Sequence, residues 1–234
     1  MSDDEPSGLR PALLAAGLAL LVVVVLPLGA LVRSKWSPLV HLDDRVERWV
    51  HRDAVAHAWL GSAAKALTQL GAPVLIDLAT VGLVVLLVLR GRPRSGLYLA
   101  SCVAGASLLS TTGKVLVARA RPSFADPISH ARGASFPSGH ATGSAAFYLG
   151  LAVVLLSLAR SRRGLLLAMA VVVPFVVAAT RVVLGVHYVS DVAAGLLIGW
   201  GWTAACTAFF TACRAQEGRP VEPLAAGLEP GPAL

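Results

Sequence analysis

Eight residues in three short stretches of the chain have side chains or backbone properties suited to phosphoryl transfer. They are Lys114, Arg121, Ser138, Gly139, His140, Arg181, His187 and Asp191. The three cations and the one carboxylate leave a net charge of +2, which complements a phosphate monoester of about −1.5 to −2 at pH 7. Arginine also matches phosphate oxygens with paired hydrogen bonds. The set therefore predicts a site for a phosphoryl group and for the charge of its transition state.

His187 and Asp191 stand four residues apart, so they share a face if the chain is helical there. The carboxylate can then hold one imidazole nitrogen and raise the basicity of the other. This favours His187 as a nucleophile that forms a phosphohistidine. His140 is the candidate general acid, which protonates the leaving oxygen and later activates water.

The triplet Ser138-Gly139-His140 stands directly before the uncharged run 141–159. It is expected at the N-terminus of a membrane helix, where free N–H groups and the positive end of the dipole favour an anion. Taken alone, the triplet is equally typical of an ordinary helix start.

Other interpretations of these residues remain open at this point. His140, His187 and Asp191 are possible zinc ligands, although three nearby cations without a carboxylate cluster oppose a divalent ion. Each cation taken singly also fits an anchor at a helix end, and His187 with Asp191 also fits a helix-surface pair. Their shared membrane depth on one side favours a single common site, and no metal or other cofactor is expected in it.

The composition is typical of a polytopic membrane protein, which would position these residues at helix ends. Of 234 residues, 56% are hydrophobic and 14% are charged, against roughly 25% charged in a soluble domain. Basic residues lie in short groups between apolar runs, so the net charge of +7 reflects membrane topology and not nucleic-acid binding. The sequence predicts an all-α fold with six transmembrane helices, over 13–32, 72–89, 96–118, 141–159, 164–180 and 192–213.

The connection 33–71 has a different character from the spans. Leu42, Val46, Trp49 and Val50 recur at helical spacing among charged residues, which predicts an amphipathic interfacial helix, followed by a second one before the next span. A soluble connecting hairpin is the alternative.

Arginine-rich connections predict the orientation of the chain. Residues 90–94 and 160–163 contain three arginines each, and the positive-inside rule places both on the cytoplasmic side. Both termini are then cytoplasmic, and the site faces the extracytoplasmic side. Asp77, near one end of the second span, is expected to snorkel to the interface, with a functional role as the alternative.

One domain is expected, over 13–213, with its signature core at about 70–212. Residues 1–12 and 214–234 are polar or rich in Pro, Gly and Glu and are predicted to be disordered tails. The first apolar run also fits an uncleaved signal-type segment.

In order and spacing, Lys114-x6-Arg121-Pro122, Pro137-Ser138-Gly139-His140 and Arg181-x5-His187-x3-Asp191 resemble the three signature motifs of the type 2 phosphatidic acid phosphatase (PAP2) superfamily. The resemblance implies a helical membrane fold and metal-independent phosphoester hydrolysis. It implies that His187 is the nucleophile, Asp191 its orienting partner and His140 the general acid. The residues that it implies for phosphate binding are Lys114, Arg121, Ser138, Gly139 and Arg181.

Gly185 also fits a frequent feature of the family, whereas Thr180 and Val189 replace the serine and proline that many members have. Both replacements leave the reacting groups in place.

The expected function is hydrolysis of a lipid phosphate or pyrophosphate at the bilayer surface. Polyprenyl pyrophosphate, phosphatidic acid and phosphatidylglycerophosphate are all candidate substrates, and phosphate transfer to another hydroxyl fits the same chemistry. A transporter or a non-catalytic lipid-binding protein is the alternative class, which the clustering of charges on one side disfavours. The amphipathic segment 41–70 is expected to shape the entry of a lipid tail.

Overall fold

The computed structural model describes residues 19–156 and 162–216, and in these two ranges it contains helices and connections but no strand. The elements are η1 (Leu20–Val25), α2 (Leu26–Arg33), α3 (Ser37–Ala56), α4 (Ala58–Leu67), η2 (Thr68–Gly71), α5 (Pro73–Leu89), α6 (Pro93–Val117), α7 (Gly139–Leu156), α8 (Arg163–Val183) and α9 (Val189–Gln216). The predicted all-α class is confirmed. The predicted tail 1–12 and residues 217–234 of the other tail lie outside the described residues.

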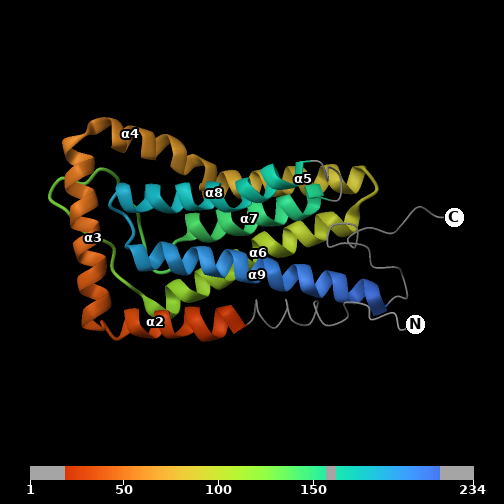
Figure 1. The fold of residues 1–234 in the computed structure, drawn as a ribbon, viewed down its shortest axis with the longest axis horizontal. Helices are drawn as coiled ribbons and strands as arrows, with labels where there is room; N and C mark the ends of the chain where they lie inside the picture. The colour runs from red at the N-terminus through yellow and green to blue at the C-terminus, as the bar shows by residue number, and fades with distance from the viewer. Residues whose placement is uncertain (1–18, 157–161, 217–234) are drawn as a thin grey trace.

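Five helical segments are long and apolar enough to cross a membrane. They are Ala58–Leu89, Pro93–Val117, Gly139–Leu156, Arg163–Val183 and Val189–Thr211. A sixth span results if the bent pair Val23–Arg33 and Ser37–Ala56 is counted as one. The chain turns by 86° between these two helices, so α3 lies across one end of the bundle (Figure 1).

Several helices continue beyond the apolar runs that predicted them. Helix α8 continues to Val183, and α9 begins at Val189 and continues to Gln216. Hydrogen bonding along the backbone carries a helix through polar residues, which hydropathy alone does not register. Arg181 and Asp191 therefore lie within helices and not in the connection between them.

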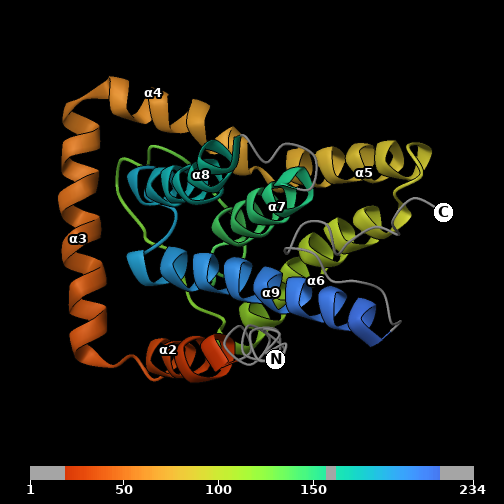
Figure 2. The ribbon, with the colours of Figure 1, turned by 45° about the vertical axis from the view of Figure 1, so that its right-hand side comes forward.

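Helix α7 lies inside the bundle and packs against α6, α8 and α9 (Figure 2). Two glycines of α9 allow the closest approach, because a Cβ at Gly195 would lie 2.7 Å from the Ser138 carbonyl oxygen, and one at Gly199 would lie 2.5 Å from that of Thr142. Small residues spaced by four are a common means of bringing membrane helices together. The backbone N–H of Ser138 also donates to the Asp191 carbonyl, at 3.0 Å. The beginnings of α7 and α9 are thereby fixed against each other.

Helix α3 turns its polar face toward the bundle. Asp43, Glu47 and His51 follow one another at intervals of four and are only 1%, 3% and 5% exposed. Leu42 and Trp49 are 52% and 62% exposed. The segment is the predicted amphipathic helix, and its outward side carries Leu42 and Trp49 beside the exposed arginines Arg45 and Arg48, a mixture that suits the surrounding interface.

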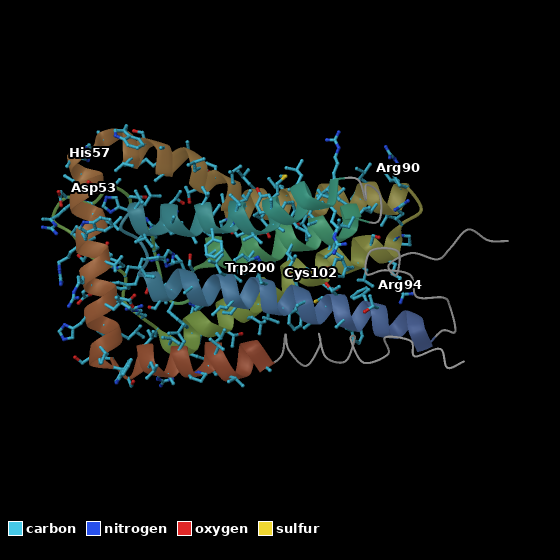
Figure 3. The ribbon with its side chains drawn as sticks, in the orientation of Figure 1. Asp53, His57, Arg90, Arg94, Cys102 and Trp200 are labelled. Carbon is cyan, nitrogen blue, oxygen red and sulfur yellow. The ribbon has the colours of Figure 1, made fainter. Side chains whose placement is uncertain are left out.

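The two ends of the bundle carry different charged groups. Asp53 and His57 mark the end that α3 covers, and Arg90 and Arg94 lie toward the opposite end (Figure 3). Asp77 lies near the beginning of α5, where its side chain is exposed.

Candidate active site

Four helix ends bring the predicted residues to one place. Lys114 lies in the last turn of α6 and Arg181 in the last turn of α8. His140 and Asp191 lie in the first turns of α7 and α9, and His187 occupies the short connection before α9. The ends of antiparallel helices thus gather side chains that are far apart in sequence.

The imidazole of His187 has one nitrogen directed at each of two charged partners. Its Nδ1 lies 3.4 Å from Oδ2 of Asp191, and its Nε2 lies 3.0 Å from Nη1 of Arg121. Because a guanidinium can only donate hydrogen bonds, Nε2 must accept, and the ring proton belongs on Nδ1 facing the carboxylate. This tautomer leaves the lone pair of Nε2 as the nucleophilic position.

Burial keeps this imidazole neutral. His187 is 2% exposed, and its burial lowers the pKa to about 4, against the opposing effect of Asp191. Desolvation disfavours the charged form of a buried histidine. At neutral pH the free protein therefore presents an uncharged ring whose lone pair is available.

Backbone carbonyls hold Arg121 over the histidine. Its Nε donates to the carbonyl of Gly133 at 3.0 Å, and Nη1 donates to that of Val186 at 2.7 Å. Nη2 donates to the carbonyls of Arg132 and Ala134, each at 3.2 Å. The guanidinium is thereby fixed next to the position that a phosphate bonded to Nε2 of His187 would take.

Three further residues, Lys114, Ser138 and Arg181, complete the group of candidate phosphate-binding side chains, here termed the phosphate cradle. Nζ of Lys114 donates to the carbonyls of Ala134 and Pro137, at 3.0 and 2.7 Å. Nη1 of Arg181 donates to Oγ1 of Thr68 in η2, at 3.0 Å. Oγ of Ser138 and Nε of Arg181 are buried without a hydrogen-bond partner. Buried donors left unpaired are costly, and a phosphate oxygen is an acceptor that would satisfy both.

His140 lies within electrostatic range of the same groups. It interacts with Arg181, His187, Arg121 and Lys114, and it follows Gly139, the first residue of α7. All eight residues singled out from the sequence therefore belong to this end of the bundle. Among the described residues, no group of three or more His, Cys, Asp or Glu side chains is arranged to hold a metal ion.

Sequence reasoning missed three groups that contact the site. Arg119 donates to Oδ1 of Asp191 at 2.7 Å and to Oδ2 of Asp43 at 2.8 Å. Ser190 donates through both its backbone N–H and its hydroxyl to Asp43. The position of Arg119 between Lys114 and Arg121 was a usable signal. Nothing in the sequence connected Asp43 with residues nearly 150 positions away.

Two cavities adjoin the site. One, of about 230 Å³, lies beside Arg121, Phe124, His130 and Gly185. The other, of about 360 Å³, is an apolar groove between α2 and α6 that reaches Phe136 and Pro137, directly before Ser138.

Comparison with known proteins identifies one solved structure with this arrangement of helices and several relatives in sequence. A solved structure, a transmembrane PAP2-type phosphatidylglycerolphosphate phosphatase from Bacillus subtilis, superimposes with a TM-score of 0.75 at 25% identity, covering 83% of this chain and 96% of that one. Phosphatidylglycerophosphatase B of Bacillus subtilis is 30% identical over 148 residues, which cover 62% of this chain and 72% of the relative.

A lipid A 1-phosphatase from Rhizobium etli is 37% identical over 122 residues, 48% of this chain. The match spans about half of that relative, 49% of its length. Residues 95–215 match the PAP2 superfamily, which is more than half of the 234 residues. This multi-pass membrane chain therefore belongs to the PAP2 superfamily.

Proposed function

We propose that the chain is an integral membrane lipid phosphatase that works through a phosphohistidine on His187. The observation that carries the proposal is the division of the His187 ring, with Nδ1 facing Asp191 at 3.4 Å and Nε2 facing the cationic side of the site. The names of the relatives, which are phosphatases of lipid phosphates, support the same reaction class.

In the first step, Nε2 of His187 attacks phosphorus and the bond to the leaving oxygen breaks. Protonated His140 donates its proton to that oxygen. In the second step, His140 takes a proton from water, the water oxygen attacks phosphorus, and the phosphorus–nitrogen bond breaks to release inorganic phosphate. Asp191 keeps the Nδ1 proton in place during both steps.

Phosphate binding falls to Lys114, Arg121, Ser138, Gly139 and Arg181. The incoming phosphate replaces Nε2 of His187 as the hydrogen-bond acceptor for Arg121. The phosphate oxygens also accept hydrogen bonds from Oγ of Ser138 and Nε of Arg181, two donors that are otherwise buried and unpaired. Donors already fixed by the fold stabilise transition-state charge without reorganising. In this mechanism the cationic side chains neutralise the charge of the phosphate, a role that a metal ion has in other phosphatases.

The substrate is a lipid whose phosphate lies at the bilayer surface. The apolar groove beside Phe136 and Pro137 offers room for an acyl or prenyl chain next to the cradle. A polyprenyl pyrophosphate, phosphatidic acid and phosphatidylglycerophosphate all have the required chemistry, as does a lipid A 1-phosphate. Transfer to an acceptor hydroxyl is the variant reaction, since a phosphohistidine reacts with whichever hydroxyl the site admits.

Orientation follows from the separation of charges along the bundle. Arg90 and Arg94 lie at the end opposite to α3 (Figure 3), and positively charged short connections favour the cytoplasm. We therefore place both termini in the cytoplasm and the site on the extracytoplasmic side.

The deciding experiment is phosphate release by the purified full chain from those four lipids, in the presence of a strong chelator. We expect turnover of at least one lipid, and we expect His187→Ala and His140→Ala each to abolish it. His57→Ala, at an exposed position in α3's C-terminal connection, is the matched control and should retain full activity. Full activity in both site variants would disprove the mechanism, and activity that returns only with zinc would revive a metal site. A folded wild-type chain that binds lipid but releases no phosphate would favour the non-catalytic alternative.

A further inference from the structure

Arg119 joins two carboxylates from opposite ends of the chain. Nη1 donates to Oδ1 of Asp191 and to Oγ of Ser190, each at 2.7 Å, and Nη2 donates to Oδ2 of Asp43 at 2.8 Å. The guanidinium also stacks on the ring of Tyr188, with its carbon 3.9 Å from the ring centre. A planar fork of donors suits such a bridge, which a single ammonium cannot reproduce.

The bridge leaves the Asp191 carboxylate with a partner on each oxygen. Oδ1 is bound to Arg119, and Oδ2 accepts the backbone N–H of Tyr188 at 3.0 Å while facing Nδ1 of His187 at 3.4 Å. A carboxylate bound on both oxygens cannot rotate away from the imidazole. Its orientation therefore depends on Arg119.

Helix α3 supplies the other half of this support. Asp43 accepts the backbone N–H of Ser190 on Oδ1 at 3.0 Å, and it accepts the Ser190 hydroxyl and Arg119 on Oδ2. Ser190 immediately precedes Asp191, so Asp43 fixes both the backbone before that carboxylate and the arginine beside it. The contacts span 147 residues of sequence.

Stability alone does not account for this cluster. Asp43 and Asp191 are 1% and 0% exposed, and two buried carboxylates share one guanidinium. Burying such ions costs desolvation energy that their attraction often fails to recover, whereas well-made buried networks fix geometry.

We infer that Asp43 and Arg119 are positioning residues of the active site, which hold Asp191 against His187 and make helix α3 a part of the catalytic machinery. This inference rests on the proposed phosphatase function. In that reaction the proton must stay on Nδ1 of His187, facing the carboxylate of Asp191, while Nε2 bonds to phosphorus. A loosened carboxylate therefore slows the chemical step. It leaves the phosphate-binding donors in place.

The test compares kcat and KM of Arg119→Gln and Asp43→Asn with those of the wild-type chain, on a lipid phosphate and on the soluble ester p-nitrophenyl phosphate. We expect kcat to fall about 10- to 100-fold on both substrates, the range typical when an orienting partner is lost, with KM within about threefold. The matched controls are Arg45→Gln and Asp53→Asn, which make the same kinds of change at exposed positions of helix α3. They should retain wild-type kcat.

A double variant separates positioning from a general structural effect. In an Asp191→Asn background, Arg119→Gln should cost less than threefold in single-turnover rate, because residues that act as a unit are strongly non-additive. A full multiplicative loss would overturn the inference. So would a KM effect without a kcat effect, or an effect confined to the lipid.

Should Arg119→Gln fail to fold, Arg119→Lys decides the matter, since lysine keeps the charge but cannot bind both carboxylates through a fork. Wild-type kcat in Arg119→Lys and Asp43→Asn would overturn the inference. If His187→Ala were inactive in the same assay, the proposed function would still stand. A wild-type chain that releases no phosphate would instead remove the proposed function itself.

Discussion

At the scale of single residues, the chemistry depends on keeping one imidazole neutral beside several cations. His187 faces Arg121 directly, and Arg181 also disfavours its protonation. These charges act in the same direction as burial, whereas Asp191 acts against them. In the proposed mechanism, His187 is therefore available as the nucleophile at neutral pH without a separate base.

The pH dependence of kcat/KM tests this state of His187. The folded pKa of about 4 lies below the ordinary histidine value of 6.5, so the neutral ring persists as the pH falls and is lost only near pH 4. After correction for the second ionisation of the substrate phosphate, near pH 6, we expect no further acid limb in kcat/KM above about pH 5, since this parameter reports the free enzyme.

The correction is made by titrating the substrate alone under the assay conditions. A remaining limb near pH 6.5 would show that His187 titrates as an ordinary solvated histidine and would contradict the burial argument.

The motif residues were predictable because their chemistry is readable from residue type and spacing. One assumption, that the helix ends meet at one membrane depth, was enough to predict that four of these residues lie together: Lys114, Arg121, His187 and Asp191. Asp43 was not predictable, because a carboxylate on an amphipathic helix is ordinarily solvated, and only tertiary contacts with Arg119 and Ser190 give it partners.

At the scale of the elements, the active site depends on how closely α7 and α9 pack. Ser138 directly precedes α7 and α9 carries Asp191, so any separation of the two helices moves the proposed phosphate-binding residue Ser138 relative to Asp191. Gly199 lies at the tightest point, because an added Cβ would lie 2.5 Å from the Thr142 carbonyl and 2.6 Å from the Ala145 Cβ.

Gly199→Ala should therefore destabilise the protein and reduce its activity. Overpacking of this kind typically costs about 1–3 kcal/mol, and neither neighbouring atom belongs to a flexible side chain. The measurement is the thermal midpoint in one detergent, together with kcat on a soluble ester. The matched control is Gly82→Ala in α5, where an added Cβ meets nothing within 4 Å. A Gly199→Ala midpoint equal to the wild type would refute the close packing of α7 and α9.

The helices themselves followed from hydropathy, but their ends and faces did not. Apolar runs predicted the five spans that follow α3. The extension of α8 to Val183 and the start of α9 at Val189 arise from backbone hydrogen bonding, which a hydropathy profile does not register. The periodicity of α3 was also visible. Helix α3 has lipid on one side and the polar site on the other. The hydrophobic periodicity of the sequence does not show which face of the helix meets which of these two surroundings.

At the scale of the whole molecule, one end of the bundle holds the candidate active site and the other carries basic connections. Helix α3 closes the first end, and Arg90 lies toward the second (Figures 1 and 3). The proposed lipid phosphatase would, with this polarity, act on phosphates exposed at one leaflet only, so its orientation limits the substrates that it can meet.

Cysteine accessibility determines that orientation directly. The native cysteines are replaced by alanine, and single cysteines are introduced as Asp53→Cys at the α3 end and Arg90→Cys at the opposite end, both at exposed positions. In sealed bacterial spheroplasts, a membrane-impermeant maleimide should label Asp53→Cys and leave Arg90→Cys unlabelled. Permeabilised membranes should label both, which controls for the reactivity of each thiol. Because α3 contacts the site through Asp43, labelling of Arg90→Cys alone in sealed cells would place the active site in the cytoplasm and restrict its substrates to lipids of the inner leaflet.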